Sequence, residues 1–392
     1  MLKRLTVQNF RSIERSSIEF APITIFFGPT SAGKSTLFYS LLVLRNFILN
    51  PNQSVDGFFN LGFQNLGGFD ACVFNHELSR PISIAAEFSD DTSYGLAMRK
   101  TDAIISFRNP ITSAEMLVPI PYAINQSWSE TVGIDREEYS VNWNGIAVSV
   151  APKSPTAATN APIAASVFNS AITQISKIDI APHRRGFFKP SYQQVPLTPI
   201  PTSEDEVATL IINDQNVPAR ISLSTDEIFN RDFRTHTPPG TAITFFQTTE
   251  RSGAKVPGYL VNDGFGVNQT VYMLAKIYRP DVQTLLIEEP EVHLHPSVIR
   301  KLARVFVQIA TDEGRQLIFT THSEQFLLSI LACVKEKLLL PSQIRCYHAT
   351  RKKKETVFSR EEVSDNGQIS GGLASFMEAE LEDVRTFLAV GD

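Results

Sequence analysis

One glycine-rich segment, residues 28–36, constrains the fold of this chain more than any other. It reads GPTSAGKST and matches the pattern G-x-x-x-x-G-K-[ST]. A β-branched, apolar run at 23–27 precedes it and a helix-like run begins at Leu37, which gives the order strand, loop, helix that the pattern requires. Backbone N–H groups of such a loop and the positive end of the helix hold phosphate groups. The alternative is a strand-to-helix turn that merely uses glycines.

The side chains of this segment are those expected at a site for a nucleotide and Mg²⁺. Lys34 supplies a mobile positive charge for the phosphates, and Ser35 supplies a hydroxyl ligand for the metal. We therefore predict a nucleotide-binding site made by Gly28, Ser31, Ala32, Gly33, Lys34, Ser35 and Thr36.

The composition is that of a globular chain rather than a disordered one. The 392 residues are 43% hydrophobic and carry a net charge of −5, and this length allows about two to three domains. Because the chain is acidic overall, DNA binding would require a local basic patch. The three cysteines are scattered singly, as in proteins of a reducing compartment. Since no apolar run approaches the ~18 residues of a membrane helix, we expect a soluble, cytoplasmic protein with no membrane partner.

Alternating and apolar runs predict the other elements of the chain. We expect a hairpin with strands at 5–7 and 18–20, antiparallel strands at 82–88 and 103–107, strands at 178–180 and 242–246, and a helix that begins near Ser203. Glycine- and phenylalanine-rich residues 57–69 predict a loop held in place by its aromatic side chains. Residues 154–162, rich in Pro, Thr, Ala and Asn, predict a linker or an exposed loop.

Two carboxylates end a strongly apolar run at 285–290, which reads LLIEEP. Acids at the end of a buried strand lie at the carboxyl edge of a parallel sheet, where open α/β sheets bind ligands. There Glu288 can hold Mg²⁺, directly or through water, and Glu289 can polarise the attacking water. The next strand, 316–321, is followed by His322, which we predict to sense the γ-phosphate; a core histidine is the alternative.

A second glycine segment, residues 262–269, precedes a helical pattern that includes Val271 and Leu274. Asn268 is predicted to cap this helix, whose N-terminus would form a second anion site. Because the chain already has one phosphate loop, this second site would serve the nucleotide of another subunit. An ordinary glycine turn with a cap is the alternative.

Taken together, these segments resemble, in the same order, the motifs of ABC-type ATPases of the SMC/OLD kind, where OLD stands for overcoming lysogenization defect. The resemblance rests on residues 9–13 (NFRSI), 28–36, 263–269 (DGFGVNQ), 287–296 (IEEPEVHLHP) and 320–325 (TTHSEQ). From the phosphate loop onward it implies a Walker A loop, a signature, a Walker B strand with its D-loop, and a switch histidine. It covers both ends of the chain well and the middle only loosely.

This resemblance implies that ATP and Mg²⁺ are the cofactors and that Glu289 and His322 are catalytic. The metal ligands would be Ser35 and Glu288. In a head-to-head dimer the signature of one subunit would complete the site of its partner. The signature residues here are Asp263, Gly264, Gly266, Asn268 and Gln269.

Three features depart from the family pattern. Thr30 and Ser31 stand where Asn and Gly are usual, which a cradle made of backbone tolerates. The signature lacks the transporter sequence LSGGQ, so the side chain that contacts the γ-phosphate in trans stays open. The glutamine-loop residue is unassigned, with Gln64 as the nearest candidate.

The end of the chain bears on the subtype. About seventy residues follow His322, which is too short for the Toprim nuclease domain that OLD nucleases carry after the ATPase. Residues 367–376 predict a closing loop, and residues 378–388 predict a helix.

We therefore predict an α/β fold, an ABC-type P-loop ATPase head with a mixed sheet, flanking helices and an inserted β-rich and partly helical region. Residues 1–91 would form the N-terminal lobe, 92–250 the insertion and 251–392 the C-terminal lobe. ATP hydrolysis in a homodimer or higher even oligomer would drive a DNA-directed process, such as anti-phage defence or DNA repair, with a separate effector protein or nuclease. The alternative is a nucleotide-dependent switch or scaffold that binds a protein partner without DNA. A transporter subunit fits less well, because the signature is not of the transporter type.

Two basic clusters are candidates for contact with DNA. The first contains His183, Arg184 and Arg185, with Lys189 nearby. The second contains Arg351, Lys352, Lys353 and Lys354 at the tip of an expected hairpin. An exposed loop with solvated charge is the alternative for the first cluster, and a solubilising loop is the alternative for the second.

Overall fold

The computed structural model describes residues 1–123, 127–134, 137–252 and 255–370. The helix predicted at 378–388, and the end of the loop predicted at 367–376, lie outside the described residues. The chain divides into two compact units. Unit 1 consists of Met1–Glu19, Ser35–Ile178 and Lys353–Thr356, and unit 2 consists of Phe20–Lys34, Asp179–Lys352 and the chain from Val357 onward. One boundary passes through the predicted phosphate loop, between Lys34 and Ser35.

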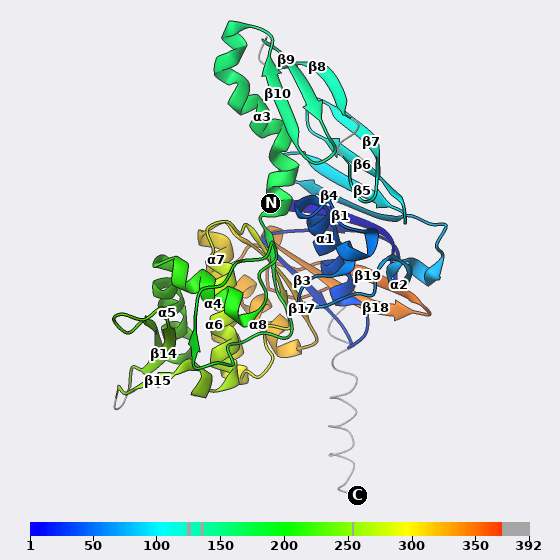
Figure 1. Cartoon of the computed structure of the whole chain (residues 1–392). Helices are drawn as coiled ribbons and strands as arrows, with labels where there is room; N and C mark the ends of the chain where they lie inside the picture. Colours follow the sequence, from blue (N-terminus) through cyan, green and yellow to red (C-terminus); the bar gives the residue numbers. More distant parts are fainter. Residues whose placement is uncertain (124–126, 135–136, 253–254, 371–392) are drawn as a thin grey trace, which may run out of the picture. The chain divides into compact units, whose positions relative to one another are not determined.

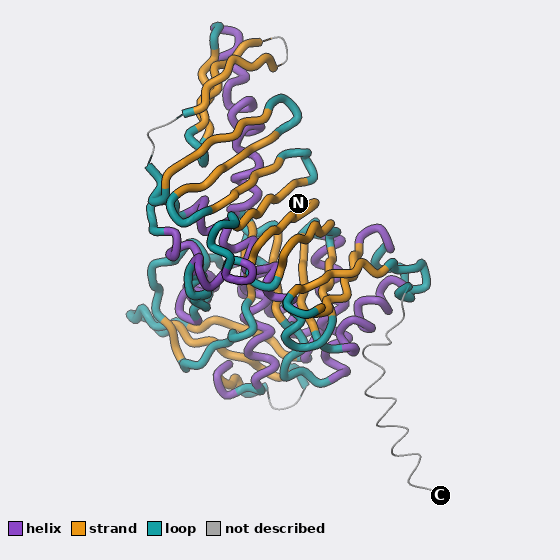
Figure 2. Tube along the Cα trace, turned by 90° about the vertical axis from the view of Figure 1, so that its right-hand side faces the viewer, coloured by secondary structure: helices purple, strands orange, loops and turns teal. Residues whose placement is uncertain are grey.

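Unit 1 is built on an antiparallel sheet of six strands, which Figure 2 shows as a ladder. In spatial order the strands are β2 (Ile13–Glu19), β1 (Leu2–Phe10), β4 (Ile82–Phe88), β5 (Ser93–Met98), β6 (Asp102–Arg108) and β7 (Ser113–Pro119). Leu5 lies opposite Ile18 in the β1–β2 pair, which confirms the predicted hairpin. The strands predicted at 82–88 and 103–107 are also confirmed as β4 and β6, and β5 pairs between them.

A second, smaller sheet and a long helix complete the β-rich part of unit 1. The sheet contains β8 (Trp128–Ile134), β9 (Glu137–Trp143) and β10 (Val148–Pro152), and α3 (Pro155–Ser176) runs alongside β9 and β10 in Figure 1. The prediction of a linker or exposed loop at 154–162 is therefore wrong. The Ser154 hydroxyl caps the helix by accepting from Ala157 N at 3.0 Å, and Pro155 occupies a first-turn position, where no backbone N–H is required.

The helix after the phosphate loop and the aromatic loop that follows it also belong to unit 1. The helix is α1 (Lys34–Leu49), and the loop contains η1 (Val55–Phe59), α2 (Phe69–Cys72) and η2 (Phe74–His76). Phe58, Phe59 and Phe69 are fully buried, and the Phe59 and Phe69 rings meet edge to face. The predicted loop, held by its aromatic side chains, is confirmed.

Unit 2 is organised around a mixed sheet of six strands. Their order is β11 (Ile178–Ala181), β16 (Thr284–Glu288), β17 (Gln316–Thr321), β3 (Ile23–Phe27), β18 (Ile344–Lys352) and β19 (Glu355–Glu361), the last of which begins in unit 1. The four central strands are parallel to one another. Their carboxyl ends therefore lie at one edge, as predicted for the strands at 23–27, 285–288 and 316–321.

Unit 2 also contains several helices and a small second sheet. The helices are α4 (Glu204–Asn213), α5 (Asn216–Phe229), α6 (Phe265–Ile277), α7 (Pro296–Asp312) and α8 (Glu324–Lys335), with short turns η3 (Leu260–Asn262) and η4 (Pro341–Gln343). The small sheet contains β12 (Ser191–Tyr192), β13 (Arg231–His236), β14 (Thr244–Glu250) and β15 (Pro257–Tyr259). α4 begins with a capping box between Ser203 and Glu206, which confirms the predicted helix start.

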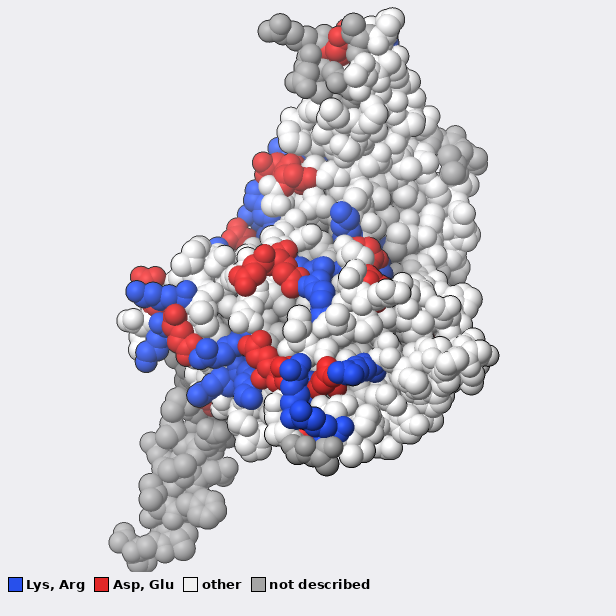
Figure 3. Space-filling model, turned by 90° about the vertical axis from the view of Figure 1, so that its left-hand side faces the viewer, with Lys and Arg blue, Asp and Glu red and all other residues white. Residues whose placement is uncertain are grey.

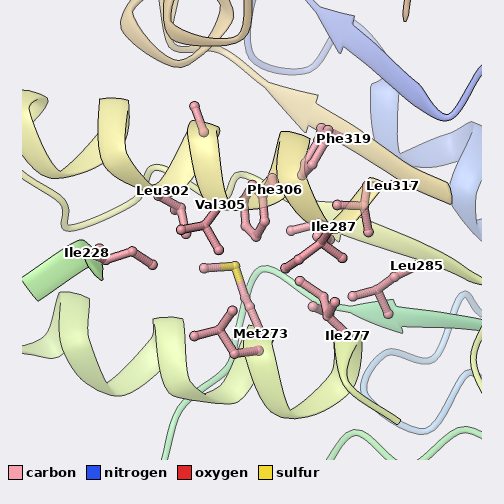
Figure 4. Close-up of a cluster of buried hydrophobic side chains, with 14 of the residues drawn as sticks. Ile228, Met273, Ile277, Leu285, Ile287, Leu302, Val305, Phe306, Leu317 and Phe319 are labelled. Carbon is pink, nitrogen blue, oxygen red and sulfur yellow. The ribbon is translucent and has the colours of Figure 1, made fainter. Parts of the chain in front are cut away.

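The core of unit 2 fixes the sheet against its helices. Figure 4 shows apolar side chains from α5, α6 and α7 converging on those of β16 and β17. Met273 and Phe306 are fully buried between these elements, as are Ile287 and Phe319 on the strands. Each fully buried side chain of this size stabilises the fold by roughly 1.5–3 kcal/mol. The strand ends that carry polar residues are thereby held in place.

Among the described residues, no helix combines the length and the apolar character that crossing a membrane requires.

Candidate active site

The predicted phosphate loop leaves β3 in a conformation that suits glycine. Gly28 has φ +136° and Gly33 has φ +93°, and a Cβ on Gly28 would collide with the carbonyl oxygen of Ala349 in β18. Ser31 also adopts a left-handed conformation, with φ +65°. The left-handed conformation has a higher free energy for serine than for glycine. Glycine is the usual residue at this position in the SMC/OLD group.

The Lys34 ammonium group is folded back onto this loop. It is 6% exposed, and Nζ donates to the carbonyl oxygens of Gly28 at 2.8 Å and Pro29 at 2.9 Å. Burial lowers the pKa of Lys34, and the negative charges of Glu289 and Glu291 oppose this shift. The lysine thus lies in a buried site with carboxylates near it. Ser35 and Thr36 begin the part of α1 that belongs to unit 1, and their roles stay predictions.

The predicted carboxylates lie where β16 ends. Glu288 is 3% exposed and its Oε2 accepts from the backbone N of His183 at 3.0 Å. The backbone N of Glu289 donates to Thr320 O of β17 at 2.8 Å. Glu289 adopts φ +44°, a left-handed conformation that is rare outside glycine and is often found at functional sites.

Two histidines contact the carboxylate of Glu289. His322 Nδ1 lies 3.1 Å from Glu289 Oε1, and His183 Nδ1 lies 3.2 Å from Oε2. His322 follows β17 as predicted, and its side chain is 46% exposed, so it is not a core histidine. The sequence placed His183 only in the first basic cluster, as a candidate for DNA contact, because it lies 106 positions before Glu289 and no motif links the two residues.

The loop after β11 also brings Arg185 to the carboxylates. Its Nη1 donates to Glu288 O at 2.5 Å and to Pro182 O at 2.9 Å, and Nη2 donates to Glu289 O at 2.7 Å. Arg185 is 3% exposed, and burial lowers its pKa to about 10 against the opposing charges of neighbouring carboxylates. The prediction that Arg185 is a candidate DNA contact is therefore wrong, because its guanidinium group is buried on backbone carbonyls. Arg184 is exposed and stays a candidate.

One further carboxylate belongs to this edge of the sheet. Glu291 is 6% exposed, and its Oε1 accepts from the Thr321 hydroxyl at 2.5 Å. Burial raises the pKa of Glu291, and the hydrogen bond from Thr321 opposes the shift. The sequence offered one signal for Glu291, its position three residues after Glu288 in the run EEPE. The prediction of site residues did not include it.

The second glycine segment forms the start of α6, but Asn268 is not its cap. The N-cap is Gly264, and Asn268 lies in the first turns of the helix, 3% exposed. Its side chain accepts from Phe187 N at 2.6 Å and donates to Phe187 O at 2.7 Å. A residue inside the helix cannot supply the cap bond that was predicted, and the bonded amide of Asn268 instead fixes the loop after β11.

The other predicted signature residues differ in how accessible they are. Asp263 pairs with Arg231 at 2.9 Å, and Gln269 is 1% exposed and donates to Val292 O at 2.5 Å. The predictions that Asn268 and Gln269 contact a partner's nucleotide are therefore wrong, because both amides are buried and bonded inside unit 2. Gly266 is also buried, and Gly264 is exposed.

Two family models match the chain. Residues 1–176 match the family described as "AAA ATPase domain", and residues 166–329 match the family described as "AAA domain, putative AbiEii toxin, Type IV TA system". The first match includes the phosphate loop, and the second includes both carboxylates and His322. The chain is an ATP hydrolase. No curated protein matches it.

Solved structures agree with this ATPase in fold. An SMC head bound to the C-winged helix domain of ScpA is similar over 92% of this chain and 97% of that chain, at 12% identity and a TM-score of 0.50. The SMC head domain from Thermotoga maritima (11% identity, 92% and 99% coverage, TM-score 0.43) is also similar. So is an Smc head domain with an extended coiled coil, bound to the C-terminal domain of ScpA derived from Pyrococcus furiosus (9%, 98% and 99%, 0.44). The ATPase has the fold of an ABC-type P-loop head, as predicted.

The residues at the carboxyl edge of the sheet include the kind of oxygen ligand that a magnesium ion prefers. Mg²⁺ prefers oxygen ligands and is commonly held by one or two carboxylates together with substrate phosphates. Glu288 offers a buried carboxylate whose position is fixed by the N–H of His183. We therefore retain Glu288 as a candidate ligand of a magnesium ion that also binds the nucleotide.

Proposed function

We propose that this ATPase binds ATP with Mg²⁺ on residues 28–36 and hydrolyses it with Glu289 as the group that orients and deprotonates water. The proposal is carried by the contacts of Glu289 with His322 at 3.1 Å and with His183 at 3.2 Å, which flank a partly exposed carboxylate. Three adjacent parallel strands, β16, β17 and β3, end in Glu288, His322 and the phosphate loop. General-base action by such a carboxylate contributes about 10²–10⁴-fold to a rate.

The other residues of the site have separate roles in this proposal. Backbone N–H groups of the loop cradle the phosphates, and Lys34 exchanges its bonds with Gly28 and Pro29 for bonds with phosphate oxygens. Mg²⁺, held by Glu288 and Ser35, would neutralise negative charge on the transferred phosphoryl group. His322 contacts Glu289, and in this proposal it responds to the γ-phosphate.

We further propose that ATP binding joins two copies of the chain, as in the SMC/OLD group that the motifs resemble. The part of the signature available for such contact is the exposed N-terminus of α6 at Gly264 and Phe265, where the positive end of the helix dipole favours an anion. Hydrolysis would release the dimer, because the bridging γ-phosphate would be lost.

The process that this cycle drives is proposed to be DNA-directed, such as anti-phage defence or DNA repair, with a separate effector. The resemblance to the OLD group supports this role. An SMC head bound to a domain of ScpA is a precedent for a partner protein. The alternative is a nucleotide-dependent scaffold for a protein partner without DNA.

Two variants test the ATPase mechanism. Lys34→Ala should abolish turnover and weaken ATP binding, because it removes the only side-chain cation of the phosphate loop.

Glu289→Gln should bind ATP but hydrolyse it about 10²-fold more slowly or worse, and should accumulate ATP-dependent dimers in light scattering. Steady-state turnover and nucleotide-binding titrations give the measurements. Wild-type turnover by Glu289→Gln would refute the assignment, and a monomer at saturating ATP would refute the dimer.

A further inference from the structure

His183 is brought to the active site from a part of the chain that carries no ATPase motif. It follows β11, the edge strand next to β16, and its backbone N already bonds to the carboxylate of Glu288. Arg185, two residues further on, bonds to the carbonyl oxygens of both Glu288 and Glu289. The loop at 182–185 is thus attached to the end of β16 by backbone and buried side-chain bonds, and the His183 imidazole extends from it.

Every polar group of Glu289 lies within 3.2 Å of a polar group of a neighbour. Its backbone N bonds to Thr320 O, its backbone O accepts from Arg185, and its two carboxylate oxygens face His322 and His183. These contacts come from β17, from the residue that follows it, and from the loop after β11. They hold the residue at φ +44°, a conformation that persists only where the surroundings enforce it.

We propose that His183 is a positioning residue for ATP hydrolysis, in which Nδ1–H donates to Glu289 Oε2 and keeps the carboxylate facing the attacking water. An ionised carboxylate can only accept hydrogen bonds, so Nδ1 carries the proton in this contact. Because each carboxylate oxygen has two lone pairs, the bond to His183 leaves acceptor capacity for water. His322 Nδ1 lies 3.1 Å from the other oxygen, so the two imidazoles flank the carboxylate and oppose its rotation.

The inference rests on the proposed role of Glu289 as the water-orienting base. A catalytic group displaced by about 1 Å can lose about 10²-fold in rate. Removal of His183 therefore affects the chemical step rather than nucleotide binding, because the phosphate loop does not include it. The His183 side chain is 55% exposed, so its substitution leaves little apolar packing to lose.

Three substitutions test whether His183 acts through a hydrogen bond to Glu289 or only by filling the space beside it. His183→Ala should lower kcat by about 10- to 100-fold and change the Kd for ATP by less than about twofold. His183→Asn should recover most of the rate, because its amide nitrogen lies near the position of Nδ1. His183→Gln should not, because its amide nitrogen lies near the position of Nε2. His236→Ala, which removes an exposed histidine at the end of β13, is the matched control and should retain wild-type kcat.

The measurements are steady-state ATP turnover, ATP binding by titration, and thermal unfolding to verify that each variant is folded. The proposal is overturned if His183→Ala keeps wild-type kcat, if it loses ATP binding in proportion to rate, or if Gln rescues as well as Asn. Glu289→Gln is measured in parallel. Wild-type turnover by Glu289→Gln refutes the proposed base, whereas a slow Glu289→Gln beside a normal His183→Ala refutes only the role of His183.

Discussion

Gly266, in the first turn of α6, lies directly against the backbone of His293. A Cβ built on Gly266 would come within 2.7 Å of His293 O and of Leu294 Cδ2. From the same helix, Gln269 bonds to Val292 O, and the Phe265 ring meets the His293 ring edge-on at 4.8 Å between centroids. The predicted signature helix and the segment after the Walker B strand therefore form one packed block, and this contact within the chain already explains the glycine.

Gly266→Ala is expected to destabilise this block. A backbone oxygen cannot move aside as a side chain can, so the added methyl group should lower the free energy of unfolding by about 1–3 kcal/mol. Gly258→Ala, at an exposed position of β15, is the matched control, because a Cβ there meets no atom within 4 Å, and its effect on stability should be within about 0.5 kcal/mol. Urea denaturation gives both values. Equal stability of the two variants would show that the role of Gly266 lies outside this chain.

Arg185→Lys is expected to loosen the end of β16. The guanidinium group reaches three carbonyl oxygens through two nitrogens, and a single ammonium group on a different stem cannot reproduce that geometry. Lost hydrogen bonds to a buried cation should cost about 2 kcal/mol of stability, and turnover should fall because Glu289 loses a backbone partner. Arg184→Lys, at the exposed neighbouring position, should leave the unfolding curve unchanged. Superimposable urea curves for both variants would contradict the prediction.

Stability should depend on pH through Glu206 at the start of α4. Burial alone raises its pKa, but hydrogen bonds from Thr198 and Ser203 outweigh burial and lower the pKa from 4.5 to about 2. A depressed folded-state pKa stabilises the fold above about pH 4.5, and this contribution disappears as the pH falls towards 2. Glu206→Gln should therefore be less stable than wild type by about 1 kcal/mol at pH 7, and the difference should shrink below pH 4.5. A difference that stays constant from pH 7 to pH 3 would refute the charge argument.

The sequence was most informative where chemistry follows a local pattern. An apolar strand that ends on polar residues, as before Glu288 and His322, indicated the sheet edge because the position of a strand end depends on few residues. The helix at 155–176 was missed because prolines and asparagines were taken as signs of a loop. Pro155 instead occupies a first-turn position, where it is tolerated.

Contacts between distant segments were not predictable in the same way. His183 and Arg185 bond to Glu288 and Glu289 across more than 100 residues, and an exposed basic loop has the same local sequence. The strand at 178–180 was predicted, but its place beside β16 was not. His322 was identified as a polar residue that follows a strand of the central sheet. If β11 had been placed beside β16, the same rule would also have identified His183. Asn268 was misassigned because helix starts are uncertain by a few residues in sequence.

Besides Arg184, the lysine tip between β18 and β19 remains a candidate for DNA contact. Lys352, Lys353 and Lys354 are exposed, and Lys353 takes φ +58° in the turn, so the predicted hairpin is confirmed. Figure 3 shows a face on which Lys and Arg are interspersed with Asp and Glu rather than gathered in one field. Because the chain carries a net charge of −5, a DNA site on it must be concentrated, and the three adjacent lysines make the tip the position to test.

Reversing the three tip lysines to Glu should weaken binding to duplex DNA of any sequence, because phosphate contacts carry no sequence information. Each lost contact should also flatten the log–log dependence of affinity on salt by roughly one unit. The matched control reverses Lys301, Lys335 and Lys337, which are exposed on other elements and give the same change in net charge. Fluorescence anisotropy at several salt concentrations measures both quantities, and ATP turnover without DNA should be unchanged in the tip variant. Equal affinity and slope in the two triple variants would make the tip a solubilising loop, and no binding by wild type would favour the scaffold function.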